Sequence, residues 1–413
     1  MRALPMAETP SIQRWLTLIG IGEDGPGGIG DEAKRLIATA PMVFGGARHL
    51  ELMGPVITGE TQTWLSPFEK SVETLLARRG EPTVVLASGD PFFYGVGATL
   101  SRRVAASEMT VIPAPSSFSL AASRLGWPLQ DTTVLSLHGR PIDLIRPHLN
   151  PGRKILALTS DGKGPAELAV LLQSSGFGQS RLTVLEALGG PNEKISRQSA
   201  AEFSLSGIND LNICGIEVKA DAGARILSLS TGLADELFEH DGQITKREIR
   251  AITLSALAPR YGELLWDIGA GSGSIGIEWM LADPSLRAIA IEASVERAAR
   301  IRRNAANFGV PGLTVVEGEA PAALTGLPAP DAIFIGGGGS DAGMLEAAIG
   351  QLKSGGRLVA NAVTTEMETL LLTEQARRGG SLIRIDIARA APVGRMTGWR
   401  PAMPVTQWSW IKP

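Results

Sequence analysis

A glycine-rich run between a buried strand and a helix start is the feature that most constrains the fold of this chain. Residues 266–276 read WDIGAGSGSIG, so an apolar strand leads directly into closely spaced glycines. Glycines at such a turn let the backbone approach a ligand at the helix N-terminus. The run predicts a doubly wound α/β domain with a ligand at the carboxyl ends of its strands.

One carboxylate in this run distinguishes between two kinds of ligand. Gly271, Gly273 and Gly276 fit the pattern that binds a dinucleotide, but Asp267 precedes them, and a carboxylate is a poor neighbour for pyrophosphate. S-Adenosylmethionine carries an ammonium group and a sulfonium, so Asp267 can accept hydrogen bonds from its amino-acid part. The sequence therefore favours a methyl donor, and a nicotinamide oxidoreductase is the weaker alternative.

Two later strand ends support the same interpretation. The apolar run 288–291 ends in Glu292, where an acid can meet both ribose hydroxyls, and the run 313–316 leads to the adenine side. The alternative is a doubly wound domain whose acids only cap helices. The predicted cofactor contacts of this half are Asp267, Gly269, Gly271, Gly273, Glu292, Gly318, Glu319 and Ala320.

Composition limits the class of protein. A chain of 413 residues has room for two domains at about 150 residues each, and a net charge of -3 gives no reason to expect nucleic acid as a partner. The single cysteine, Cys214, excludes an internal disulfide and a multi-cysteine metal site. No apolar run approaches the roughly 20 residues that span a bilayer. We expect a cytoplasmic protein without a membrane partner or a resident metal.

The pattern along the chain predicts two α/β domains. Short β-branched runs alternate with longer amphipathic stretches in two series, which predicts domains over 12–220 and 236–413 with a linker within 220–238. Near the end, 381–387 and 405–410 alternate like antiparallel strands that close the second sheet.

Four loops in the first half carry small residues, glycines or acids at strand ends. They are GIG at 20–22, SGDPFFYG at 88–95, PAPSS at 113–117 and LTSDG at 158–162. In this order they resemble the tetrapyrrole methylase family, the two-lobed class III methyltransferases of rings such as uroporphyrinogen and precorrins. One feature departs from the family pattern, because Glu23 and Asp24 are inserted in the first loop. For Asp90 there is a structural alternative to a cofactor contact, in which it caps the turn that follows it.

That resemblance implies a cofactor site in the first half. S-Adenosylmethionine would be folded between the two lobes, and the macrocycle would enter near Gly22. The residues that the resemblance places around the cofactor are Gly20, Gly22, Ser88, Gly89, Asp90, Pro91, Ser116, Ser117, Thr159, Ser160, Leu188 and Gly189.

The second half has its own charged and glycine-rich segments. In TKREIR at 245–250, Thr245 and Glu248 have capping-box spacing, while three cations lie where the helix dipole disfavours them. Such a violation can mark function, and a solvated charged surface is the alternative. An open backbone follows a later strand at 336–339. The predicted substrate-positioning residues of the two halves are His138, Arg140, Lys246, Arg247, Arg250 and Asn361.

The segments TKREIR, LWDIGAGSGSIGIE, GEAP and DAIFIGGGG resemble the class I, Rossmann-like methyltransferases of the cobalamin pathway that methylate a precorrin and remove the carboxyl of its ring C acetate. The two halves together resemble fused enzymes with both activities. This implies methylation of precorrin-6B at carbon 5 by the first half, and at carbon 15 with decarboxylation by the second, giving precorrin-8.

The same resemblance implies one S-adenosylmethionine per half and a homo-oligomer formed through the C-terminal domain. The alternative from another class is a tetrapyrrole-binding scaffold or sensor in which only one half is catalytically active. The residues themselves assign no general acid or base.

Overall fold

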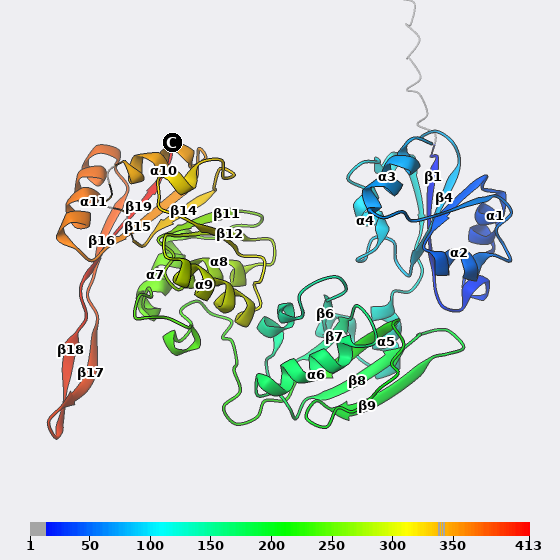
Figure 1. The fold of residues 1–413 in the computed structure, drawn as a ribbon, viewed down its shortest axis with the longest axis horizontal. Coiled ribbons are helices and arrows are strands. Elements are labelled where there is room, and N and C mark those ends of the chain that lie inside the picture. Colours follow the sequence, from blue (N-terminus) through cyan, green and yellow to red (C-terminus); the bar gives the residue numbers. More distant parts are fainter. Residues whose placement is uncertain (1–13, 338, 340, 342) are drawn as a thin grey trace, which may run out of the picture. The chain divides into compact units, whose positions relative to one another are not determined.

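The computed structural model describes residues 14–337, 339, 341 and 343–413. The chain forms two compact units, each with its own sheets (Figure 1). The first ends at Arg225 and the second begins at Ile226, except that Asp143–Leu149 groups with the second unit. This division falls within the predicted linker at 220–238. Among the described residues, no helix is both long enough and apolar enough to cross a membrane.

The first lobe of the first unit is a five-stranded parallel sheet in the order β3-β2-β4-β1-β5. Its central strands are buried almost throughout, as expected for a parallel sheet that packs between helices. The strands are β1 Leu16–Ile21, β2 Met42–Gly45, β3 Glu60–Thr63, β4 Thr83–Ser88 and β5 Met109–Ile112, and the helices are α1 Asp31–Thr39, α2 Ala47–Met53, α3 Phe68–Leu76 and α4 Val96–Leu100.

The second lobe is a mixed five-stranded sheet in the order β6-β7-β10-β8-β9. Only β6 and β7 pair in parallel, and the remaining neighbours are antiparallel. Cys214 is buried in this sheet, and burial raises the pKa of its thiol. The elements are β6 Thr133–Ser136, β7 Lys154–Leu158, β8 Arg181–Glu186, β9 Lys194–Ser199, β10 Asn212–Glu217, α5 Ser117–Leu125 and α6 Gly164–Ser174.

The second unit is a doubly wound domain around a seven-stranded sheet in the order β13-β12-β11-β14-β15-β19-β16. The first five strands are parallel, and β19 runs antiparallel to both of its neighbours, β15 and β16, so the predicted closing strands are confirmed. The strands are β11 Leu264–Ile268, β12 Arg287–Glu292, β13 Thr314–Glu317, β14 Ala332–Ile335, β15 Arg357–Ala362, β16 Ser381–Ile385 and β19 Val405–Ile411, and the helices are α7 Arg247–Leu257, α8 Ser274–Ala282, α9 Val295–Asn307, α10 Met344–Gln351 and α11 Thr365–Arg378.

The strand order of this sheet fixes where a ligand can bind. From β11 the chain winds to one side through β12 and β13, and then to the other side through β14 and β15. Such a reversal opens a crevice at the carboxyl ends of the two strands that flank it. The α/β fold predicted for both halves is confirmed.

A two-stranded arm extends from the second unit. Strands β17 Ala388–Val393 and β18 Met396–Pro401 pair only with each other and project from the sheet (Figure 1). Their side chains Val393, Met396 and Trp399 are largely exposed. An isolated hairpin with exposed apolar side chains is only marginally stable in water.

Candidate active sites

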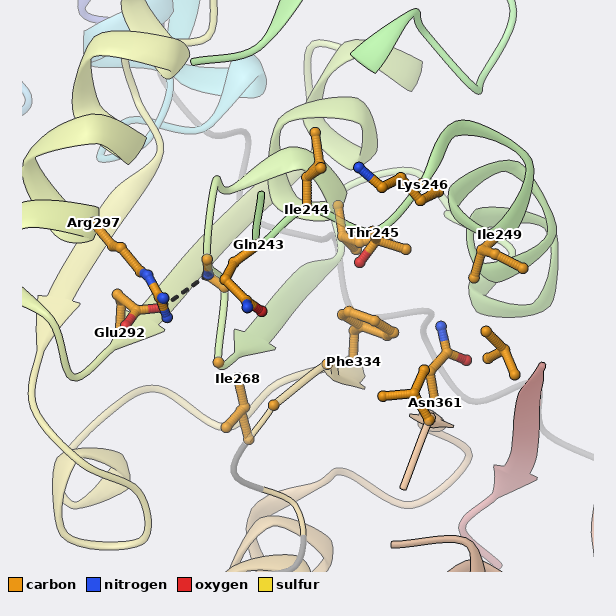
Figure 2. A pocket seen from close by; sticks show the side chains of 18 of the residues that line it. Gln243, Ile244, Thr245, Lys246, Ile249, Ile268, Glu292, Arg297, Phe334 and Asn361 are labelled. Carbon is orange, nitrogen blue, oxygen red and sulfur yellow. Dashed lines mark hydrogen bonds between the residues drawn. The ribbon is translucent and has the colours of Figure 1, made fainter. Parts of the chain in front are cut away.

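The second unit has a cavity of about 710 Å³ at the carboxyl ends of β11, β12, β14 and β15. Figure 2 shows Glu292 and Arg297 together on one side, and Asn361 near Ile249 on the other, with Phe334 between them. Of the predicted cofactor contacts, those that line this cavity are Gly269, Gly271, Glu292, Gly318, Glu319 and Ala320.

The glycine loop needs its glycines for two different reasons. Gly269, Gly271 and Gly273 have φ values of 69°, 59° and 76°, a left-handed conformation that other residues rarely adopt. A Cβ on Gly269 would also lie 2.5 Å from the carbonyl oxygen of Gly337. Gly273 is the N-cap of α8 and does not line the cavity. Its left-handed φ gives Gly273 a role in the turn, and its predicted contact with the cofactor stays a prediction.

Glu292 lies at the end of β12, as the sequence predicts. Its two carboxylate oxygens accept hydrogen bonds from the amides of Gly271 (2.8 Å) and Ser294 (3.0 Å). Each oxygen retains a second lone pair. Glu292 is therefore held in place and can still accept hydrogen bonds from a ligand in the cavity.

At Asp267 the structure differs from the prediction. This carboxylate is fully buried behind the glycine loop, does not line the cavity, and accepts a hydrogen bond from the amide of Gly276 at 3.0 Å. Burial, with a smaller contribution from the charge of Glu292, raises the pKa of Asp267 to about 7. The Asp267 side chain therefore lies beneath the loop, where its hydrogen bond with Gly276 supports the turn.

An Asp267→Asn variant is expected to gain stability relative to the wild type as pH rises from about 5 to about 8. A carboxyl whose pKa is raised on folding binds more protons in the folded state, so wild-type stability falls between the unfolded pKa near 4 and the folded value near 7. Asparagine stays neutral and keeps an oxygen for Gly276. Denaturant unfolding of both proteins at the two pH values measures the change, and a pH-independent difference would contradict it.

The three cations at the start of α7, Lys246, Arg247 and Arg250, differ in their environments. Lys246 lines the cavity, and its Nζ lies 4.0 Å from a carboxylate oxygen of Asp235. Arg247 is exposed and does not line it. The helix begins at Arg247 with Lys246 as N-cap and no side-chain cap, so the predicted capping box of Thr245 is wrong.

Arg250 is a structural residue, which corrects its predicted role in substrate positioning. Its side chain is fully buried, and Nε donates to Oε1 of Glu278 at 2.6 Å. The guanidinium also bonds the carbonyls of Thr245 (2.6 Å) and Leu233. Arg250 therefore anchors the segment that includes Thr245, which lines the cavity. Arg250 itself does not line the cavity.

Asn361 lines the cavity from β15, as predicted. Its Nδ2 donates to Oγ1 of Thr253 at 3.0 Å, and its Oδ1 accepts from Nε2 of Gln407 at 2.9 Å. Both partners are buried. Of the predicted open backbone at 336–339, Gly336 and Gly337 line the cavity and Gly338 lies outside the described residues.

The first unit has a cavity of about 540 Å³ formed by both lobes. Its polar groups are already partly paired: Ser116 caps α5 through the amide of Ser119 at 3.1 Å, and Oγ1 of Thr159 bonds Oδ1 of Asn212 at 2.5 Å. The predicted residues that line it are Gly22, Ser88, Gly89, Ser116, Ser117, Thr159, Ser160, Leu188 and His138.

Other predicted residues of the first unit lie outside this lining. Asp90 accepts a hydrogen bond from the amide of Phe92 at 2.8 Å, so it caps its own turn, which was the structural alternative. The amide of Gly189 donates to Glu193, and Arg140 lies over the ring of Tyr94, 5.7 Å from its centroid. Gly20 and Pro91 are the other two predicted cofactor contacts that do not line this cavity.

Comparison with known proteins agrees with this geometry. Residues 15–204 match the tetrapyrrole (corrin/porphyrin) methylases, and residues 236–412 match the precorrin methyltransferase domain. A precorrin-6Y C(5,15)-methyltransferase (decarboxylating) of Sinorhizobium sp is 71% identical over 406 residues, which is 98% of each chain. The chain belongs to this methyltransferase family. It is accordingly an S-adenosylmethionine-dependent methyltransferase, and the nicotinamide alternative is not supported.

Two shorter relatives from Salmonella typhimurium each match less than half of the chain. A cobalt-precorrin-7 C(5)-methyltransferase is 32% identical over 180 residues, covering 44% of this chain and 88% of its own length. A cobalt-precorrin-6B C(15)-methyltransferase (decarboxylating) is 33% identical over 179 residues, covering 42% and 92%. In Salmonella typhimurium, these two named activities thus belong to separate chains.

The sequence did not single out a charged cluster in the first cavity. Arg48 pairs with Glu23, and Ser88 lies within hydrogen-bond distance of both Arg48 (3.1 Å) and Nε2 of His49 (2.8 Å). Burial and the charge of Arg48 lower the pKa of His49 to about 4, so this imidazole is neutral. The only available signal was the RH pair after the double glycine at 45–46. Among the described residues, no cluster of acids, histidines and cysteines could hold a metal.

Proposed function

We propose that this chain methylates precorrin-6B at carbons 5 and 15 and removes the carboxyl of its ring C acetate, giving precorrin-8 in cobalamin biosynthesis. The observation that carries the proposal is the presence of two separate cavities, each built at strand ends by glycine-containing loops within its own unit. Two methylations need two donor molecules, so we assign one S-adenosylmethionine to each unit.

We assign carbon 5 to the domain at 12–220, and carbon 15 with decarboxylation to the domain at 236–413. The names of the two single-activity relatives support this division. They also support an order: the C(15) relative is named for cobalt-precorrin-6B and the C(5) relative for cobalt-precorrin-7, so the second unit would act first.

The second cavity fits S-adenosylmethionine, which supplies an electrophilic methyl group on its sulfonium. Glu292 has free lone pairs for ribose hydroxyls, the backbone at Gly269 and Gly271 leaves room for a ligand, and Gly318 and Ala320 would border the adenine. In the first cavity, the loops at 88–89, 116–117 and 159–160 would surround the cofactor.

Catalysis by these residues is mostly positioning. A nucleophilic carbon held in line with the methyl group can gain about 7 kcal/mol or more from alignment alone. The macrocycle carries several carboxylates, which suit cations such as Lys246 and Arg389 of the second cavity and Arg48 of the first. Each such hydrogen bond contributes only about 1.5–3 kcal/mol, so several must act together.

We further propose that the chain acts in the cytoplasm as a homo-oligomer, with no nucleic acid or membrane partner. The exposed apolar side chains of the β17–β18 arm support self-association through the second unit, because a second copy would bury them.

The test is the mass of the tetrapyrrole recovered after incubation with S-adenosylmethionine and precorrin-6B. We expect a gain of two methyl groups and the loss of one carbon dioxide. A single methyl group together with the loss of carbon dioxide would leave only the second unit active, as in the scaffold alternative, and an unchanged mass would contradict the proposed substrate.

A further inference from the structure

The cavity of the first unit has a histidine and a serine in contact in its wall. His49 lies on α2, Ser88 is the last residue of β4, and both line the cavity. Nε2 of His49 is 2.8 Å from Oγ of Ser88. Nη2 of Arg48, which also lines the cavity, is 3.1 Å from each of these two atoms. The three side chains therefore form a closed cluster that faces a ligand.

Arg48 determines where the protons of this cluster lie. A guanidinium only donates hydrogen bonds, so its contact with Nε2 of His49 requires that nitrogen to be unprotonated, and the ring proton lies on Nδ1. Arg48 also donates to Oγ of Ser88, which leaves the hydroxyl to donate its own proton to Nε2. His49 is thus a neutral base whose lone pair faces a hydroxyl group in the cavity.

The other bases of this cavity are less well placed to accept a proton. Among the described residues that line it, the acids are Glu23 and Asp210, and the second histidine is His138. Glu23 pairs with Arg48, and Asp210 accepts a hydrogen bond from a backbone amide at 3.0 Å. One ring nitrogen of His138 lies 3.4 Å from a backbone carbonyl. His138 is therefore the natural comparison for His49.

We propose that Ser88 and His49 together accept the proton that carbon 5 loses after it is methylated. The proposal rests on the function proposed above. Carbon 5 bonds the methyl group with a π electron pair, and S-adenosylhomocysteine leaves. This bridge carbon then holds both the methyl group and its hydrogen, which interrupts the conjugation. Ser88 takes the proton and passes its own to Nε2 of His49, and the electron pair of the broken C–H bond restores the conjugation.

Arg48 makes this proton transfer depend on the substrate. Its positive charge disfavours a second positive charge on His49, and a carboxylate of the macrocycle bound to Arg48 would offset that charge. The methylated macrocycle also carries the positive charge that came with the methyl group, so its C–H bond is acidic and a weak base suffices. After the product leaves, the charge of Arg48 again favours release of the proton to water.

A His49→Gln variant tests the proposal with precorrin-6B that carries deuterium at carbon 5. Glutamine keeps an oxygen for the Ser88 hydroxyl but cannot hold the proton. We expect methyl transfer to carbon 5 near the wild-type rate and loss of deuterium slowed by about a hundredfold. A methylated intermediate that retains deuterium would then accumulate, with the absorbance of an interrupted conjugated system. A merely structural defect would slow both steps alike.

Two further variants show whether the pair itself is responsible. Ser88 is exposed at the end of β4, so Ser88→Ala fits there, and we expect the same separation of methyl transfer from deuterium loss. In His138→Gln the two steps should stay together. Equal slowing of both steps in His49→Gln and in Ser88→Ala, or a separation only in His138→Gln, would overturn the role of the pair alone. No methylation at carbon 5 by the wild type would overturn the proposed function as well.

Discussion

A Gly20→Ala variant is expected to lose methylation at carbon 5 by about a hundredfold or more and to keep methylation at carbon 15 with decarboxylation. Gly20 lies in β1, the strand between β4 and β5. A Cβ there would lie 1.9 Å from the carbonyl oxygen of Gly89 and 2.5 Å from the amide nitrogen of Ala114. Both are backbone atoms, so the loops that border the cavity must move apart, at a cost of about 1–3 kcal/mol or more.

The matched control for this variant is Gly30→Ala in the same unit. Gly30 has φ of -70° and no atom within 4 Å of an added Cβ, so alanine fits there. Product masses after incubation with substrate and donor distinguish the two activities. An equal loss of both methylations in Gly20→Ala would show that the two units do not act independently, and normal methylation at carbon 5 would show that this cavity is not its site.

An Arg250→Met variant is expected to lower the free energy of unfolding of the second unit by about 3–5 kcal/mol. Methionine keeps much of the apolar volume but leaves the carboxylate of Glu278 buried without its cation. Glu278 is 2% exposed and also accepts hydrogen bonds from the amides of Gly232 (2.7 Å) and Leu233 (3.0 Å). The loop at 242–246, which lines the cavity, loses the bond that Arg250 makes to the Thr245 carbonyl.

The comparison for this variant is Arg303→Met, which breaks an exposed pair on α9. Arg303 and Glu239 are each about half exposed, so the loss should be no more than about 1 kcal/mol. Denaturant unfolding of the full chain measures both, with Trp266 and Trp279 as buried fluorescent reporters in the second unit. Similar losses in the two variants would mean that burial does not govern the energy of the Arg250 pair.

The position of Glu292 could be predicted because it depends only on local order along the chain. A strand that ends in an acid must present that acid at the carboxyl edge of a parallel sheet, and the structure places Glu292 in the cavity wall. The same reasoning located Asn361 at the end of β15 and most of the small residues in the loops of the first unit.

The roles of Arg250, Asp90 and Asp267 could not be predicted in the same way. Each is a charged residue beside a strand end or helix start, and the sequence gives no measure of its burial. Arg250 turned inward to Glu278, Asp90 bonded its own turn, and Asp267 lies beneath the glycine loop. Arg48 and His49 reach the first cavity from α2, so their relation to Ser88, some 40 residues away in the chain, required the packed lobes.

The sequence by itself determined the two α/β domains, the order of their loops and the preference for a methyl donor, because these follow from residue types and short-range spacing. Only the tertiary structure decided which charged side chains face the cavities and which are buried in ion pairs. The physical reason is that solvation and charge pairing depend on contacts between elements far apart in the chain, such as Asn361 with Gln407 and Arg250 with Glu278.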